Sequence, residues 1–241
     1  MFELIGNFFH LFFYQPLVNL LIALYVFLPG QSLGAAIILI TLLLKIVLYP
    51  STQQSLKSQK TMNELQPKIK DIQKKYKDDK QKQAEEMMKL YKEKKFNPFA
   101  GFLPLLIQLP IFIALYQIFQ TGIGQSHLDL LYSFVPRPQE INQMFLGVDL
   151  SKANIFLAAV VGIAQYFQTK TSLPANPLKP ESGDQMGQFS SMMQNYTLYF
   201  FPIMTIMILA ALPSGLGLYW LVNTVLSIGQ NYLVFNKKTV Q

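Results

Sequence analysis

Residues 33–52 read LGAAIILITLLLKIVLYPST, and this stretch decides the fold class. It is 20 residues long and carries one charge, Lys45. A helix of that length crosses a hydrocarbon core about 30 Å thick. The pair Tyr49-Pro50 marks its end. We therefore predict a membrane-spanning helix here and an all-α integral membrane protein around it.

The composition of the whole chain agrees with a membrane protein. Of its 241 residues, 51% are hydrophobic and 14% are charged, whereas soluble domains carry about 25% charged residues. The chain has no cysteine, which excludes disulfides, thiolate metal sites and cysteine nucleophiles. Its two histidines, His10 and His127, have no ligand-like spacing. We expect no metal and no cofactor.

Working outward from the first span, four further apolar stretches predict a total of five spanning helices. The predicted spans are residues 33–52, 99–123, 152–168, 196–212 and 214–235. The predicted connections are an N-terminal segment (1–32), a helical hairpin (53–96), an external loop (124–150), a cytoplasmic loop (169–195) and a tail (236–241).

The N-terminal segment, residues 1–32, is apolar but interrupted by Pro16 and by Pro29-Gly30. The piece from Pro16 to Leu28 has 13 residues, too few for a straight span. We interpret it as a helix lying in the outer interface of the membrane. The alternative is a true span over residues 8–28.

Residues 53–96 differ sharply from the spans, because they hold 13 lysines and seven acidic residues. Apolar residues recur there at helical spacing. The first stripe is Met62, Leu65, Ile69, Ile72 and Tyr76, and the second is Ala84, Met87, Met88 and Tyr91. Asp78-Asp79 provides a turn and a helix cap, and Pro67 predicts a late start or a kink in the first helix. We predict an antiparallel helical hairpin.

Lysine placement predicts the orientation of the chain. Cytoplasmic segments of membrane proteins carry an excess of Lys and Arg, and the lysine-rich segments here are 53–96, 169–195 and 236–241. Five spans put all three on one side. We therefore expect a multi-pass membrane protein, with its N-terminus outside and its C-terminus in the cytoplasm.

The hairpin lysines have two interpretations. They enforce topology only, or they form a docking surface for ribosomal RNA, a targeting particle or anionic lipid headgroups, because lysine-rich surfaces attract phosphate. The candidate docking residues are Lys68, Lys70, Lys74, Lys75, Lys77, Lys80 and Lys82.

Lys45 is a charged residue deep within the first predicted span. It lies roughly 10 Å inside the inner boundary at about 1.5 Å per residue, where a charge costs about 3 kcal/mol or more. Either its stem snorkels to the headgroups, or it is the cation of a hydrated pocket that opens toward the cytoplasm. Polar residues in the apolar runs favour the pocket. They are Thr41, Gln108, Gln165, Gln168, Asn223, Thr224 and Gln230.

Large apolar side chains offer a second surface. Phe112, Met204, Tyr219 and Trp220 are either ordinary core residues or a soft surface that accepts varied partner helices, a role that suits methionine. The chain contains no Ser-His-Asp set, no acidic pair within a span and no phosphate-binding glycine loop. We predict that it is not an enzyme.

Several motifs together resemble the YidC/Oxa/Alb membrane insertases. The first is the run from Thr41 to Pro50. In order along the chain there follow Leu65-Gln-Pro-Lys-Ile69, Glu86-Met-Met-Lys-Leu-Tyr91, Asn97-Pro98, Pro104-Leu-Leu-Ile-Gln-Leu-Pro110, Pro213-Ser-Gly215, Leu218-Tyr-Trp220 and Asn223. The resemblance covers roughly residues 14–235 and implies five core spans, a cytoplasmic hairpin and an interfacial helix.

The resemblance also implies a location, the bacterial cell membrane, and a function. Members of that family insert and fold newly made membrane proteins, alone or beside the Sec translocon. It implies nascent membrane proteins as clients, with the ribosome, the Sec translocon and anionic lipids as further partners and no specific small-molecule ligand. Lys45 stands where the family usually has a groove arginine, so the charge is kept but the planar fork is lost.

Two other functions remain open at the level of sequence. One is a small-solute or ion transporter with Lys45 as an anion site, although the chain shows no inverted repeat and no second intramembrane charge. The other is a scaffold that binds ribosomes and inserts nothing.

Overall fold

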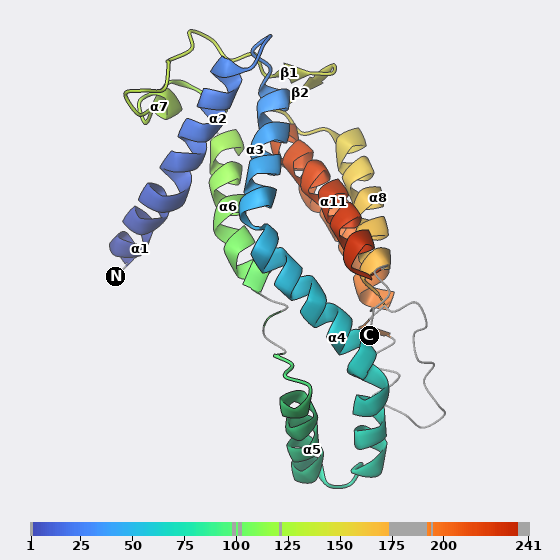
Figure 1. Cartoon of the computed structure of the whole chain (residues 1–241). Coiled ribbons are helices and arrows are strands. Elements are labelled where there is room, and N and C mark those ends of the chain that lie inside the picture. Colours follow the sequence, from blue (N-terminus) through green and yellow to red (C-terminus); the bar gives the residue numbers. More distant parts are fainter. Residues whose placement is uncertain are drawn as a thin grey trace.

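The computed structural model describes residues 2–97, 100, 103–120, 122–173, 192–193 and 195–235. The described chain is mostly helical (Figure 1). A group of long helices forms the body, and α4 and α5 project from one end of it (Figure 1). We call that end the hairpin side and the opposite end, with α7 and the two short strands, the loop side. The predicted tail, 236–241, and most of the predicted loop 169–195 lie outside the described residues.

The N-terminal segment forms one uninterrupted helix instead of a short piece that begins at Pro16. Its parts are α1 (Phe2–Phe9), a π-helical turn η1 (His10–Tyr14) and α2 (Gln15–Phe27). In the wider turn the amide of Gln15 donates to the carbonyl of His10. Because the wider turn changes the spacing of the backbone groups just before Pro16, the helix contains the proline ring without being interrupted. The predicted division at Pro16 is therefore wrong.

The first predicted span is shorter than expected because the chain bends within it. The helix α3 (Leu33–Val47) ends at Leu48, and α4 (Tyr49–Lys75) leaves at an angle of 65°. Pro50 lies in the first turn of α4, a position that proline favours. The predicted boundary at residue 52 therefore falls inside α4.

The rest of the body consists of four helical segments. They are α6 (Leu103–Gln120), α8 (Ile155–Ser172), η3 with α10 (Tyr196–Phe200 and Phe201–Leu209) and α11 (Ser214–Phe235). The main buried core joins α2, α3, α6 and α11, and a smaller one joins α8, α10 and α11. Helix α11 therefore belongs to both cores and connects the two halves of the body.

Helix length and composition alone do not confirm a count of five spans. Within the described residues, Glu3–Phe27 is long and apolar enough to cross a membrane, and the bent pair α3–α4 qualifies if it is counted as one span. The segments Leu106–Gln120 and Tyr196–Leu209 are apolar but shorter. Helices α8 and α11 have the necessary length, but polar side chains such as Gln165 and Asn223 lower their mean hydropathy.

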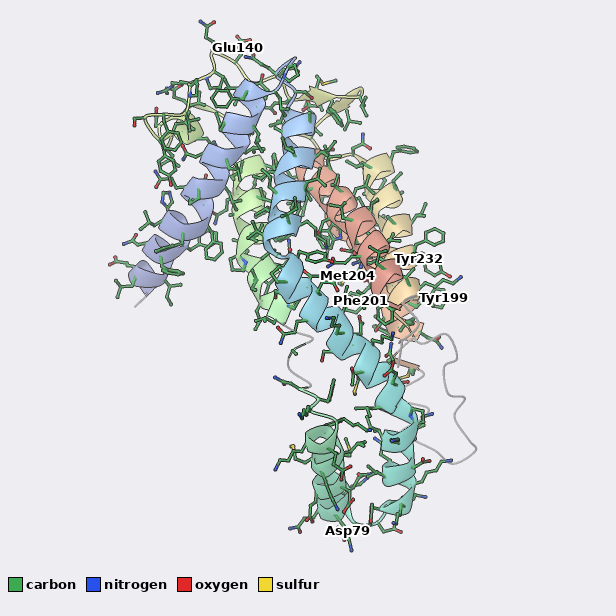
Figure 2. All side chains as sticks on the ribbon, viewed as in Figure 1. Asp79, Glu140, Tyr199, Phe201, Met204 and Tyr232 are labelled. Atoms are coloured by element: carbon green, nitrogen blue, oxygen red, sulfur yellow. The ribbon has the colours of Figure 1, made fainter. Side chains whose placement is uncertain are left out.

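The predicted hairpin is present. Helices α4 and α5 (Lys80–Glu93) pack through a small core whose buried members are Leu65, Ile69 and Leu90. The Asp79 side chain accepts from the amide of Lys82 at 2.9 Å and caps α5, as predicted. Asp79 lies at the tip of the hairpin (Figure 2).

Other details of the hairpin agree with expectation only in part. Helix α4 continues through Pro67, so the predicted late start of that helix is wrong. On α5, Met87 and Tyr91 of the predicted stripe pack against the hairpin core, whereas Ala84 and Met88 are exposed and Gln83 and Leu90 are buried instead. The Gln83 amide donates to the carbonyl of Gln73 at 3.3 Å, which makes a polar residue acceptable in the seam.

The predicted external loop folds against the loop-side ends of the helices. It contains α7 (Gln125–Leu128) and a two-stranded antiparallel ribbon of β1 (Met144–Phe145) and β2 (Val148–Asp149). Buried Asn19 on α2 accepts from the amide of Tyr132 at 2.6 Å and donates to the carbonyl of Leu130 at 3.0 Å. These bonds fix the loop to the N-terminal helix.

Helices α8 and α10 approach closely at Gly162. A Cβ added there would lie 2.3 Å from Cγ1 of Ile206 and 3.1 Å from the carbonyl oxygen of Pro202. We expect Gly162→Ala to separate the two helices and to lower the free energy of unfolding by about 1–3 kcal/mol, the usual cost of overpacking. Denaturation of the full chain in detergent measures the change. Gly229→Ala is the matched control, since no heavy atom lies within 4 Å of its added Cβ.

The burial of His127 predicts that acid lowers the stability of the loop side of the protein. Its side chain is 1% exposed, and neither ring nitrogen has a hydrogen-bond partner in the described structure. Burial lowers the pKa of His127 below its ordinary value near 6.5. The unfolded chain therefore takes up the proton first, and stability present at neutral pH is lost as the pH falls below about 6.5.

The measurement is the melting temperature in detergent between about pH 7.5 and about pH 5.5. We expect the parent chain to lose more stability over this range than His127→Leu, which has no group to protonate. Parallel curves for the two proteins would show that His127 does not contribute.

Candidate functional site

A cavity of about 300 Å³ lies on the hairpin side of the body, where α3 meets α4. Parts of α6, α8 and α11 complete its wall. Its lining residues are Thr41, Leu44, Lys45, Leu48, Ser51, Thr52, Pro104, Ile107, Gln108, Gln168, Tyr219, Asn223 and Ser227. The lining mixes apolar side chains with hydroxyl, amide and ammonium groups, so the cavity can hold water or a polar chain.

Lys45 is the cation of this cavity. Its Nζ donates to Oγ of Ser227 at 2.7 Å and to Oδ1 of Asn223 at 3.4 Å, and both acceptors lie on α11. Within the described residues, none of the ion pairs includes Lys45. The half-buried ammonium is thus held by neutral oxygens, and its charge is not cancelled by a carboxylate.

The hydrogen bonds of Lys45 leave it able to bind an anion. An ammonium has three N–H donors and no acceptor, and the two bonds to Ser227 and Asn223 use two of them. A carboxylate that reached the cavity would find a donor and an uncompensated positive charge. Charge-assisted bonds of this kind are about twice as strong as neutral ones.

Four of the six predicted groove residues line the cavity: Thr41, Lys45, Gln108 and Asn223. The Thr41 hydroxyl donates to the carbonyl of Ile37 at 2.6 Å, which leaves its oxygen free to accept. The Gln108 amide nitrogen donates to the hydroxyl of Tyr219, which joins α6 to α11 across the cavity.

The other two predicted groove residues, Gln165 and Thr224, do not line the cavity. The Oε1 atom of Gln165 accepts from Nε1 of Trp220 at 3.1 Å, so its amide serves the contact between α8 and α11. Thr224 is 1% exposed and follows Asn223 on α11, about 100° further round the helix. Both are polar residues of helix contacts and not of the cavity wall.

Sequence reasoning missed Ser227, the nearest hydrogen-bond partner of Lys45. Its hydroxyl also donates to the carbonyl of Asn223 at 2.7 Å, which aims the oxygen lone pairs at the ammonium. The signal was present in the sequence, because Ser227 lies four residues after Asn223 and therefore on the same helix face. Ser51 was also missed; its buried hydroxyl lines the cavity and has no partner in the described structure.

The four predicted client-contact residues do not form one patch. Tyr219 is buried and lines the cavity. Trp220, the next residue, packs edge-on against Phe112 with ring centroids 5.3 Å apart. Met204 lies on α10 and is half-buried. The aromatic pair Phe112–Trp220 thus stands on α6 and α11 beside the cavity, while Met204 belongs to another helix.

Hydrogen bonds tie the base of the hairpin to the two helices that flank the cavity. The Asn63 amide on α4 donates to the carbonyl of Ser172 at 3.2 Å. Asn231 on α11 donates to the Ser172 hydroxyl at 2.7 Å and to the Thr171 hydroxyl at 3.2 Å. The middle of α4 and the C-terminal ends of α8 and α11 therefore meet at one polar junction on the hairpin side.

The candidate docking lysines surround the far end of the hairpin. All are exposed except Lys70, which is half-buried. Lys75 and Lys82, from the two helices, both lie over the ring of Tyr76, at 5.3 and 5.7 Å from its centroid. The hairpin tip is thus a concentrated positive surface, remote from the body (Figure 2).

Comparison with known proteins gives a consistent family. The family model described as "60Kd inner membrane protein" matches residues 23–241. The membrane protein insertase YidC of Nitratidesulfovibrio vulgaris is 36% identical over 228 residues, covering 94% of this chain and 39% of that protein. The YidC of Magnetococcus marinus is 34% identical over 209 residues, covering 86% of this chain and 33% of that protein.

A solved structure agrees with these relatives. A crystal structure described as an active YidC insertase with its first transmembrane domain resolved is 29% identical, with a TM-score of 0.59. The match covers 91% of this chain and 46% of that one. The chain spans only about a third of the length of the curated relatives named above. The extent of the family match, together with the shared fold, shows that this chain belongs to the 60Kd inner membrane protein family, in which YidC is found.

Proposed function

We propose that this chain is a membrane protein insertase and chaperone, which inserts and folds newly made membrane proteins. The relatives that carry this name support the proposal. The observation that carries it is the cation of Lys45, held only by neutral oxygens of α11 in a polar cavity. The mechanism has no covalent step.

The polar part of a client enters the cavity from the hairpin side. Lys45 attracts its acidic groups with the remaining ammonium donor, while Thr41, Gln108 and Asn223 offer further hydrogen bonds. A polar chain pays several kcal/mol for each unsatisfied backbone group in hydrocarbon. The cavity lowers that cost over part of the membrane thickness.

The apolar part of the client leaves sideways into lipid. The pair Phe112–Trp220 stands beside the cavity and offers an aromatic surface to an apolar segment. Burial of the segment in the bilayer supplies the driving force, because transfer of apolar surface out of water is favourable. The insertase only lowers the barrier for the polar tail.

Orientation and partners form part of the same proposal. The lysines of the hairpin and of the segments 169–195 and 236–241 support an orientation with the hairpin side in the cytoplasm. The cavity then opens to the compartment where clients are made. The positive tip of the hairpin docks the ribosome, and the body acts alone or with the Sec translocon.

Reversal of the cavity charge tests the mechanism. We expect Lys45→Glu to reduce insertion of a single-span client with an acidic tail more than ten-fold in liposomes without Sec components, because a buried charge of the wrong sign costs about 3 kcal/mol. Lys45→Arg keeps the charge and is expected to retain most activity. Protease protection of the client tail measures insertion.

Two comparisons make this experiment specific. Lys57→Glu, at an exposed position of α4, makes the same change in net charge and should insert normally. A client whose tail carries no acidic residue should be less sensitive to Lys45→Glu than the acidic client. Equal insertion of the acidic client by Lys45→Glu and the parent would contradict the role of the charge. Anion uptake without client insertion would instead identify a transporter.

A second prediction separates docking from insertion. Replacing the seven docking lysines with glutamine should weaken ribosome binding and flatten its dependence on salt, because each phosphate contact contributes to the salt slope. The replaced residues are Lys68, Lys70, Lys74, Lys75, Lys77, Lys80 and Lys82. Co-sedimentation with ribosomes at increasing salt concentration measures both quantities.

The matched control neutralises acidic residues on the same hairpin. Asp71→Asn, Asp78→Asn and Glu85→Gln leave the cap residue Asp79 in place and raise the positive charge, so they should strengthen binding. Insertion of released clients in liposomes should survive the lysine replacements. Unchanged ribosome binding in the lysine variant would show that the hairpin charge serves topology alone.

A further inference from the structure

The outer face of α8 carries a groove that is separate from the Lys45 cavity. One hollow of about 350 Å³ lies between α8 and the segment η3–α10. A second, of about 560 Å³, lies along η3 and the start of α10, and the two hollows share Tyr199 and Ile203 in their walls. Neither has a lining residue in common with the Lys45 cavity. Tyr199 projects from the outer edge of the body (Figure 2). The mechanism above makes no use of this groove.

The inner end of the groove is apolar and built around a close helix contact. Gly162 brings α8 against α10, and Ile163, Ile203 and Ile206 line the space beside it. Ile163 is 59% exposed and Ile203 57%, so the groove faces outward. A flexible hydrocarbon chain fits such a surface, since it offers no group that needs a polar partner.

The other end of the groove has tyrosine side chains, and the positive charge of Lys170 lies next to its lining. Tyr166 and Tyr199 face each other across it, with ring centroids 6.0 Å apart. The exposed ammonium of Lys170 lies 5.9 Å from the centroid of the Tyr166 ring. In the described structure, Lys170 has no carboxylate within ion-pair distance. Tyrosine and lysine at the end of an apolar surface are typical of the headgroup level of a membrane.

The dimensions match one leaflet of the bilayer. Gly162 lies near the middle of α8, and Lys170 lies eight residues later in its last turn, about 12 Å further along the helix axis. The polar end is therefore on the hairpin side, and the apolar end reaches about the midplane. A lipid of the hairpin-side leaflet would place its headgroup and its chains at these two levels.

We propose that this groove is a binding site for one anionic phospholipid of the hairpin-side leaflet. An acyl chain lies along Gly162, Ile203 and Ile206, and the phosphate lies between Lys170 and the hydroxyl of Tyr199. The carbonyl groups at the C-terminal end of α8 carry a partial negative charge, which repels an anionic headgroup. The positive charge of Lys170 offsets this repulsion, so Lys170 is the group that selects an anionic headgroup. The site is independent of client insertion.

The test uses the single tryptophan of the chain, Trp220. In the background Trp220→Phe, the replacement Phe167→Trp puts one fluorophore in the groove wall on α8 and leaves the Tyr199 hydroxyl in place. The full chain is reconstituted in phosphatidylcholine bilayers with increasing fractions of dibrominated phosphatidylglycerol or dibrominated phosphatidylcholine. We expect phosphatidylglycerol to bind about five-fold more strongly, the gain that one lysine gives near an anionic surface.

Two variants make the result specific to the groove. Lys170→Gln in the same background should remove the preference for phosphatidylglycerol. A tryptophan at Phe156, which is 76% exposed at the other end of α8, should show equal quenching by both lipids. If the tryptophan variants fail to fold, native mass spectrometry of the parent chain and of Lys170→Gln should show phosphatidylglycerol retained by the parent only.

Three outcomes would overturn the proposal. Equal quenching by the two lipids at position 167 would show an ordinary lipid-facing surface. A preference for phosphatidylglycerol that persists in Lys170→Gln would show that this lysine only stabilises the C-terminal end of α8 and does not select the headgroup. Quenching that is equal for both lipids and is lost when a client segment is added would assign the groove to a protein partner.

Discussion

A lysine placed among apolar helices needs oxygen atoms around its ammonium, and the chain satisfies that need across its whole length. Lys45 on α3 finds its acceptors at Asn223 and Ser227 on α11, 178 and 182 residues away. These bonds hold α3 and α11 together, although the two helices lie far apart in the sequence. Helices α6 and α8 then close the remaining sides of the cavity that the lysine requires. Most other features of the body follow from this long-range contact.

The bend at Leu48 gives the same lysine its access to the hairpin side. A straight helix through Val47 would continue the wall of the body, whereas α4 turns away by 65° and leaves Ser51 and Thr52 in the cavity rim. The polar junction of Asn63, Ser172 and Asn231 then holds the departing helix against α8 and α11. The hairpin is therefore attached at its base and free of the body at its charged tip.

The sequence predicted features with a strong local signal. The bounds of α11, the hairpin and the Asp79 cap all depend on short-range patterns and were found. Pro16, which was expected to divide the N-terminal segment, lies within a continuous helix directly after a π-helical turn. Pro67 also lies inside a helix, α4, which does not start late as one of the two alternatives predicted. The positions of the neighbouring helices decide whether Gln165 and Thr224 line the cavity or a helix contact. The presence of a polar residue in an apolar run of sequence does not distinguish these two cases.

Two consecutive residues of α11 show how thin the boundary between the polar and apolar surfaces is. Tyr219 lines the cavity and receives a hydrogen bond from Gln108, while Trp220 packs on Phe112 and donates to Gln165. Side chains of adjacent helical residues point about 100° apart around the helix axis. Two neighbouring faces of α11 therefore carry the polar cavity wall and the aromatic surface. A client whose tail occupies the cavity and whose apolar segment touches the aromatic pair would therefore need to bridge only the width of α11. In the proposed mechanism, that short distance would let one client keep its polar tail and its apolar segment in contact with the body at the same time.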